Sequence, residues 1–106
     1  LRGRSSFQSP AYNAVKMIEA ALGGEKFTLP AGCYVNCDKC GFKNVMMAMP
    51  STIDKTGVHF VEPAGTEEEM ASLAKSYEHL CKMRDEIVEL GIVPPVAEWK
   101  EMNPNL

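Results

Sequence analysis

One long helix constrains the fold of this chain more than any other feature. Thr66 and Glu69 can make a capping box, in which the Thr66 hydroxyl accepts from the Glu69 amide and the Glu69 carboxylate accepts from the Thr66 amide. Good helix formers follow, and Gly91 can take the left-handed conformation that ends a helix. The pattern predicts a helix over residues 67–90, roughly 35 Å long. Because a chain of 106 residues holds one core of modest size, we expect a single small domain, residues 1–106.

A second helix is predicted over residues 10–22. Ser9 followed by Pro10 is typical of a helix start, and Gly23 with Gly24 supplies a C-terminal stop. Apolar residues recur along this segment at helical spacing and form one stripe. They are Ala11, Val15, Ile18 and Leu22. We expect this stripe to pack antiparallel against the long helix.

The long helix carries an apolar seam near heptad spacing, which Arg84 interrupts. The seam consists of Met70, Leu73, Tyr77, Leu80 and Ile87. It is longer than the first helix can cover, so its excess surface is available to another protein. We therefore predict that Tyr77 and Ile87 contact a partner subunit.

The remaining segments predict a small β element and an irregular tail. Residues 32–41 form a cysteine-rich loop, and the runs 42–49 and 58–61 are compatible with two short strands that pair as a hairpin. Residues 92–106 contain three prolines and predict a tail that docks on a partner through Trp99, or alternatively folds back on its own core. The predicted fold class is mainly α with a small β and metal-loop element, that is, α+β.

The spacing of the cysteines is the feature that indicates chemistry. Cys33, Cys37 and Cys40 fall within eight residues, and Gly41 allows the backbone to turn tightly after the third. Cys81 stands apart on the long helix. Four thiolates that converge would close a tetrahedral structural zinc site with no open position for catalysis. We therefore predict that these four cysteines bind zinc and pin the loop to the helix.

Residues 37–42, with the sequence CDKCGF, resemble the knuckle of zinc-ribbon proteins, in which two cysteines of a tight turn bind zinc. The resemblance covers six residues, and the chain lacks the second knuckle that completes a ribbon. It implies that Cys33 and Cys81 supply the remaining ligands. If Cys81 instead packs in the core as a small apolar residue, His59 is the replacement ligand.

Other uses of the thiols stay open. Three clustered thiolates and one remote thiolate also suit the iron atoms of a 4Fe-4S cluster. Two disulfides and uncoordinated thiols are further alternatives, although the x2 spacing favours metal or redox roles in a reducing compartment. A thioredoxin-like use of Cys37 and Cys40 needs a helix N-terminus that lowers the pKa of one thiol. Gly41 and the strand-like run after it argue against that arrangement.

Charge and hydropathy exclude two common function classes. A formal net charge of −3 gives no basic field for a nucleic-acid backbone. RNA binding through Lys39, Phe42 and Lys43 is therefore the least favoured function.

The longest apolar run, Val45–Met49, falls far short of the roughly 20 residues that cross a bilayer. We expect no transmembrane segment, which leaves a peripheral position on a membrane complex open.

These features predict a small non-catalytic, metal-binding accessory subunit of a larger protein complex, with other protein subunits as its partners. The alternative is an iron–sulfur subunit that transfers electrons within a redox complex.

The N-terminus indicates a compartment. It contains basic residues and serines before any acidic residue, namely Arg2, Arg4, Ser5 and Ser6. Residues 1–8 therefore read as the remnant of a leader for import into a mitochondrion or plastid, and without such a leader we expect a cytoplasmic protein.

Overall fold

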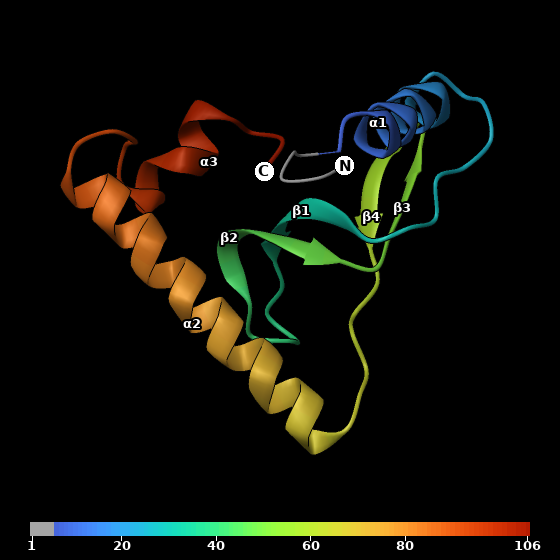
Figure 1. Cartoon of the computed structure of the whole chain (residues 1–106). Coiled ribbons are helices and arrows are strands. Elements are labelled where there is room, and N and C mark those ends of the chain that lie inside the picture. The colour runs from blue at the N-terminus through green and yellow to red at the C-terminus, as the bar shows by residue number, and fades with distance from the viewer. Residues whose placement is uncertain (1–5) are drawn as a thin grey trace. The chain divides into compact units, whose positions relative to one another are not determined.

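The chain has a mixed α+β structure, seen in a computed structural model that describes residues 6–106 (Figure 1). The elements in chain order are α1 (Gln8–Ala21), β1 (Ala31–Asn36), β2 (Lys43–Met49), β3 (Ser51–Asp54), β4 (Gly57–Phe60), α2 (Glu67–Glu89), the 3₁₀ turn η1 (Val96–Glu98) and α3 (Trp99–Met102). Most of the predicted leader remnant, residues 1–8, lies outside the described residues. None of the described helices is long and apolar enough to cross a membrane.

The chain divides into two compact units, and each is built from two separate segments. Unit 1 consists of the chain up to Ala31 together with Met49–Val61, and unit 2 consists of Gly32–Ala48 together with Glu62–Leu106. The predicted single domain stays a prediction, because units built from interleaved segments can belong to one domain. The helices α1 and α2 belong to different units, so their predicted antiparallel packing also stays a prediction.

The sequence-based prediction of the long helix is confirmed. Helix α2 begins after Thr66, and both bonds of the capping box are present. The Glu69 amide donates to Thr66 Oγ1 at 3.2 Å, and the Thr66 amide donates to Glu69 Oε2 at 2.8 Å. Past the other end, Gly91 has a φ of 72°. A left-handed glycine here lets the chain leave the helix without a steric penalty.

Helix α1 ends as predicted but begins earlier. Gly23 has a φ of 95°, and the Gly24 amide donates to the Glu19 carbonyl at 2.9 Å, which closes the helix in a Schellman arrangement. The predicted start at Ser9 is wrong, because Phe7 is the N-cap residue and no side chain caps the helix. Pro10 is tolerated in the first turn because the amide it lacks would have no partner within the helix.

The predicted strand pairing is wrong. The segments 42–49 and 58–61 do contain strands, but β2 pairs with β1, and β4 pairs antiparallel with β3. The predicted cysteine loop is half strand, because β1 includes Cys33. Each observed pair consists of consecutive strands, joined by residues 37–42 between β1 and β2 and by residues 55–56 between β3 and β4.

The β3–β4 turn shows why the local partner is favoured. The Thr56 amide donates to Asp54 Oδ1 at 2.8 Å, and Gly57 has a φ of 118°. Both features stabilise a tight reversal of the chain. The register places Ser51 opposite Phe60 and Asp54 opposite Gly57.

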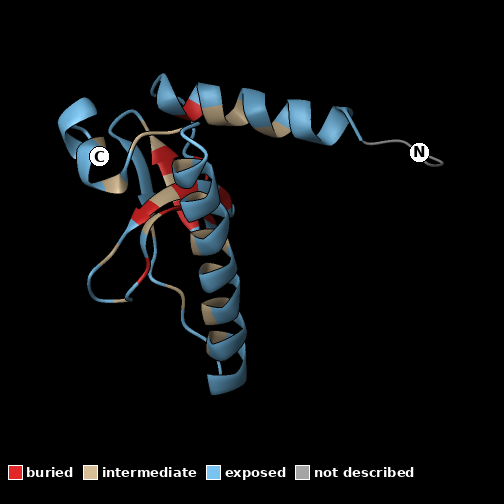
Figure 2. Ribbon diagram, turned by 90° about the vertical axis from the view of Figure 1, so that its left-hand side faces the viewer, coloured by how far each residue is buried: buried red, intermediate tan, exposed pale blue. Residues whose placement is uncertain are grey.

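The buried residues lie almost entirely on the strands and their flanks (Figure 2). In unit 1, Ala20, Phe27, Ala31 and Ile53 form one cluster, with Met17 against it. The buried positions alternate along β1 and β2, as expected of strands with one inward face, and all but the first residue of β1 and the last of β2 belong to unit 2. Helix α2 has no buried residue at all.

The capping box predicts a measurable contribution to stability. Thr66→Ala removes the acceptor for the Glu69 amide, so we expect the free energy of unfolding to fall by about 1 kcal/mol. Urea denaturation followed by far-ultraviolet circular dichroism measures the change. Thr28→Ala is the matched control at an exposed position outside any helix, and an equal loss in both variants would contradict the capping role.

Candidate functional site

The turn between β1 and β2 holds two of the predicted metal ligands side by side. The Cys37 amide donates to the Phe42 carbonyl at 2.8 Å, and the Gly41 amide donates to the Cys37 carbonyl at 3.0 Å. Gly41 has a φ of 77°, which a residue with a Cβ adopts only at a cost. The Cys40 amide donates to Cys37 Sγ at 3.2 Å, and Cys40 Sγ lies 3.9 Å from the Cys37 carbonyl oxygen. The two thiols therefore share one tight turn.

The two thiols of the turn are electrostatically unlike. Hydrogen bonds from the Cys40 side chain and then from its backbone amide lower the pKa of Cys37, because they stabilise the thiolate. Burial and then the hydrogen bond with Cys37 raise the pKa of Cys40. This asymmetry is typical of vicinal thiols in a turn whose amides point at one sulfur.

Exposed ion pairs flank the turn. Lys39 Nζ lies 3.0 Å from Glu62 Oε2, and Lys43 pairs with Asp38. The hydrogen bond from Lys43 lowers the pKa of Asp38. Such pairs are screened by water and contribute little to stability. They do place two positive side chains close to the cysteine turn.

The other two cysteines lie in different surroundings. Cys33 is on the inward face of β1, with only 4% of its surface exposed. Cys81 is on α2, as predicted, and its hydrogen bond with the Tyr77 side chain raises the pKa of Tyr77. Cys33 is thus part of the core, whereas Cys81 is half-buried on α2 beside Tyr77.

A metal site needs at least three or four ligands around one point. Among residues 6–106, no group of three or more histidine, cysteine, aspartate or glutamate side chains is placed to hold a metal ion. The structure therefore does not assemble the four-thiolate donor set that zinc or a 4Fe-4S cluster requires. The proposed ligand set of Cys33, Cys37, Cys40 and Cys81 stays a prediction.

The alternative ligand His59 belongs to unit 1 and has polar neighbours of its own. Its Nε2 lies 2.7 Å from the Thr56 hydroxyl and 3.6 Å from Asp54 Oδ1. These contacts stabilise the β3–β4 turn. His59 as a metal ligand likewise stays a prediction.

Arg84 connects α2 to the start of β2. Its Nη1 donates to the carbonyls of Lys43 and Asn44, each at 3.2 Å, while Nε donates to Asp85 Oδ1 at 2.9 Å. The Tyr77 hydroxyl accepts from the Lys43 amide at 3.2 Å, and the Tyr77 ring lies 4.9 Å from the Phe42 ring. Helix α2 is thus held to the hairpin by polar and aromatic contacts at its edge.

A cavity of about 330 Å³ lies in unit 2 beside these contacts. Its lining combines apolar side chains of β2 and α2 with a few polar groups. The lining residues are Tyr34, Asn44, Val45, Met46, Leu80, Met83, Arg84, Glu86, Ile87 and Trp99. The volume is at the lower end of the range for small-molecule sites.

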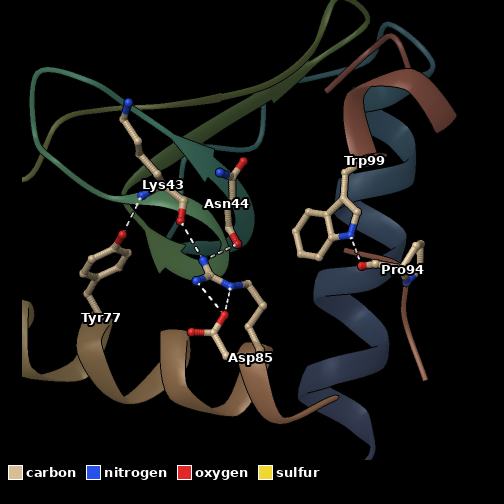
Figure 3. Close-up of polar contacts among 7 residues, drawn as sticks. Lys43, Asn44, Tyr77, Asp85, Pro94 and Trp99 are labelled. Atoms are coloured by element: carbon tan, nitrogen blue, oxygen red, sulfur yellow. Dashed lines mark hydrogen bonds and ion pairs between the residues drawn. The ribbon is translucent and has the colours of Figure 1, made fainter. Parts of the chain in front are cut away.

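The predicted partner-binding residues are mostly occupied within their own unit. The Trp99 ring lies 6.5 Å from the Tyr34 ring, and its Nε1 donates to the Pro94 carbonyl at 2.7 Å (Figure 3). Tyr77 contacts the hairpin, as described above. Ile87 lines the cavity and keeps 39% of its surface exposed. The contacts of Trp99 match the alternative that the tail folds back, and binding of a partner by these residues stays a prediction.

Sequence reasoning missed two residues that shape the site. Asn44 has a φ of 55°, unusual for a residue other than glycine, and Tyr34 donates to its Oδ1 at 2.5 Å. No sequence pattern marked either residue. A signal for Arg84 did exist, because a charged residue that interrupts an apolar seam needs a partner.

Comparison with known proteins gives partial matches. The chain is 35% identical over 75 residues to a malate dehydrogenase of Geobacillus kaustophilus, which covers 70% of the chain and 24% of that protein. It is 33% identical over 79 residues to a malate dehydrogenase of Roseiflexus sp., covering 74% of the chain and 25% of that protein. The chain thus spans about a quarter of the length of the curated relatives it matches. No family model matches the chain.

The role of Arg84 predicts a loss of stability when its charge is removed. Arg84→Met keeps the apolar stem but removes both bonds to the β2 carbonyls, so we expect the free energy of unfolding to fall by about 1–2 kcal/mol. Denaturant unfolding monitored by Trp99 fluorescence measures it. Lys82→Met is the control at an exposed position of the same helix, with an expected change within about 0.5 kcal/mol. Equal stability of the two variants would contradict the link.

Proposed function

We propose that this chain works as a segment of a malate dehydrogenase, in which it forms part of the scaffold around the reaction centre. The observation that carries the proposal is the 35% identity over 75 residues to the malate dehydrogenase of Geobacillus kaustophilus. That match takes in 70% of the chain and therefore extends over both units. In this proposal the chain is part of a larger protein and does not itself catalyse the reaction.

The exposed apolar face of α1 supports a place within a larger protein. Five large apolar residues on or beside α1 each have more than half of their surface exposed. They are Phe7, Tyr12, Val15, Ile18 and Leu22. Contiguous apolar surface of this kind is usually covered in the native protein. We propose that other parts of the dehydrogenase cover it.

The chemistry of the buried residues supports a scaffold role. Oxidation of the malate alcohol removes a hydride and a proton, and the groups that stabilise such a transfer act best where water is excluded. Among the described residues, the buried positions include one polar side chain, Ser51, whose hydroxyl donates to the Leu29 carbonyl at 3.0 Å. This bond holds two segments of unit 1 together. We propose that the reacting groups come from other parts of the enzyme.

The proposed scaffold role shares two features with the function predicted from the sequence, namely a larger assembly and the absence of catalysis by this chain. It differs from that prediction because the predicted function includes a structural zinc ion. The pairing of Cys37 with Cys40 supplies two thiol ligands, whereas a structural zinc site takes four ligands. The scaffold role needs no metal.

A chimera tests the proposed function. The matched 75 residues of the Geobacillus kaustophilus malate dehydrogenase are replaced by the corresponding residues of this chain, and malate oxidation is measured. We expect a rate within about tenfold of the parent enzyme, equivalent to about 1.4 kcal/mol of activation free energy. A chimera that folds, as judged by its melting curve, but does not oxidise malate would contradict the proposal.

Matched variants of the chimera separate folding from activity. Val35→Asp places a charge at a fully buried position and should abolish both the folded state and malate oxidation. Asn36→Asp makes a similar change at the neighbouring exposed position and should leave both unchanged.

A further inference from the structure

The cysteine turn has the geometry of a reactive dithiol. The backbone amide of Cys40 donates to Cys37 Sγ at 3.2 Å, and Cys40 Sγ lies 3.9 Å from the Cys37 carbonyl oxygen. Both residues are partly exposed, so a small reagent in solution can reach them. The turn is closed by two backbone hydrogen bonds, which hold the two sulfur-bearing residues in one orientation.

We propose that Cys37 and Cys40 are a modification site at which hydrogen peroxide forms an intramolecular disulfide within the β1–β2 turn. The inference is independent of the proposed function, because it depends only on the local geometry of unit 2. It differs from a thioredoxin-like site, since the pair lies in a hairpin turn that leads into a strand rather than into a helix.

The reaction proceeds in two balanced steps. The Cys37 sulfur attacks one oxygen of hydrogen peroxide, the O–O bond breaks, and the departing hydroxide takes a proton to leave as water. The Cys40 sulfur then attacks the sulfur of the resulting sulfenic acid, the S–O bond breaks, and a second water leaves. Two thiols and one peroxide thus give one disulfide and two waters, with two electrons passing from sulfur to oxygen.

The assignment of Cys37 as the attacking thiol follows from its hydrogen-bond donors. The Cys40 amide donates to its sulfur at 3.2 Å. Donors around a sulfur stabilise the anionic form, which is the nucleophile. Cys40 is more shielded and its sulfur faces the Cys37 carbonyl. It is therefore placed to act second.

The separation of the two residues permits a disulfide. A disulfide needs Cα atoms about 4.4–6.8 Å apart. Residues i and i+3 of a tight turn lie within about 7 Å of each other. The left-handed conformation of Gly41 already accommodates the sharp bend that follows the pair. Closing the bond therefore needs side-chain rotation and little movement of the backbone.

The other two cysteines are placed for different roles. Cys33 is 4% exposed within β1, and Cys81 is half-buried on α2. Neither shares the turn with Cys37. The structure thus singles out one pair among the four cysteines of the chain.

The experiment treats the fully reduced chain with hydrogen peroxide. Free thiols are counted, and the linkage is located by mass spectrometry of peptides that separate the cysteines. We expect the thiol count to fall from four to two, a loss of two hydrogen atoms in mass, and a Cys37–Cys40 linkage that dithiothreitol reverses. Linkage through Cys33 or Cys81, links between chains, or sulfinic acid formed without linkage would overturn the proposal.

Variants identify the order of the steps. Cys40→Ser should trap a sulfenic acid on Cys37, detected as an adduct with dimedone, whereas Cys37→Ser should give no such adduct on Cys40. Cys33→Ala and Cys81→Ser are the controls, and both should still form the Cys37–Cys40 disulfide. Because a variant can fail to fold, circular dichroism is recorded for each. If a variant does not fold, the disulfide linkage found by mass spectrometry in the peroxide-treated chain without substitutions is sufficient to test the proposal. Zinc retained by both thiols with no disulfide formed would overturn the proposal.

Discussion

The Arg84 guanidinium is the contact on which the organisation of unit 2 depends. Helix α2 is 23 residues long, and none of its residues is fully buried, although the apolar residues along one face are half-buried. Arg84 also binds two carbonyls at the start of β2, and Tyr77 contacts the same segment through its hydroxyl and its ring. All of these contacts meet at residues 42–44. That segment follows directly on the cysteine turn, so the turn and the helix are mechanically linked.

The surroundings of the four cysteines differ more than their spacing suggests. One thiol fills a core position of β1, two share a turn, and one lies on α2 beside a tyrosine. The pair in the turn combines partial exposure with a neighbouring cysteine in the same turn. Its chemistry is therefore local to the hairpin. The proposed place of the chain in a malate dehydrogenase rests on the sequence match, and the exposed apolar face of α1, which belongs to the other unit, supports it.

The sequence was a good guide wherever structure is decided by neighbouring residues. The capping box at Thr66 and the glycines at positions 23 and 91 were located correctly, since each acts within one helical turn. The start of α1 was missed, because Ser9 could cap a helix but nothing local required the helix to begin there. The contacts of Arg84, Tyr34 and Asn44 were not predictable, because each joins residues ten or more positions apart.

Sequence alone determined where the two long helices end and that the segments of β2 and β4 are extended, because these features depend on backbone hydrogen bonds and torsion angles a few residues apart. It did not predict β1 or β3 as strands. Only the tertiary structure decided which strand pairs with which. Alternation of apolar and polar residues along a strand indicates which face is buried, but it does not determine which other strand is the hydrogen-bonding partner. Tertiary structure likewise decided which cysteine side chains are neighbours. The number of residues between two cysteines determines the distance between them only when both lie in the same turn.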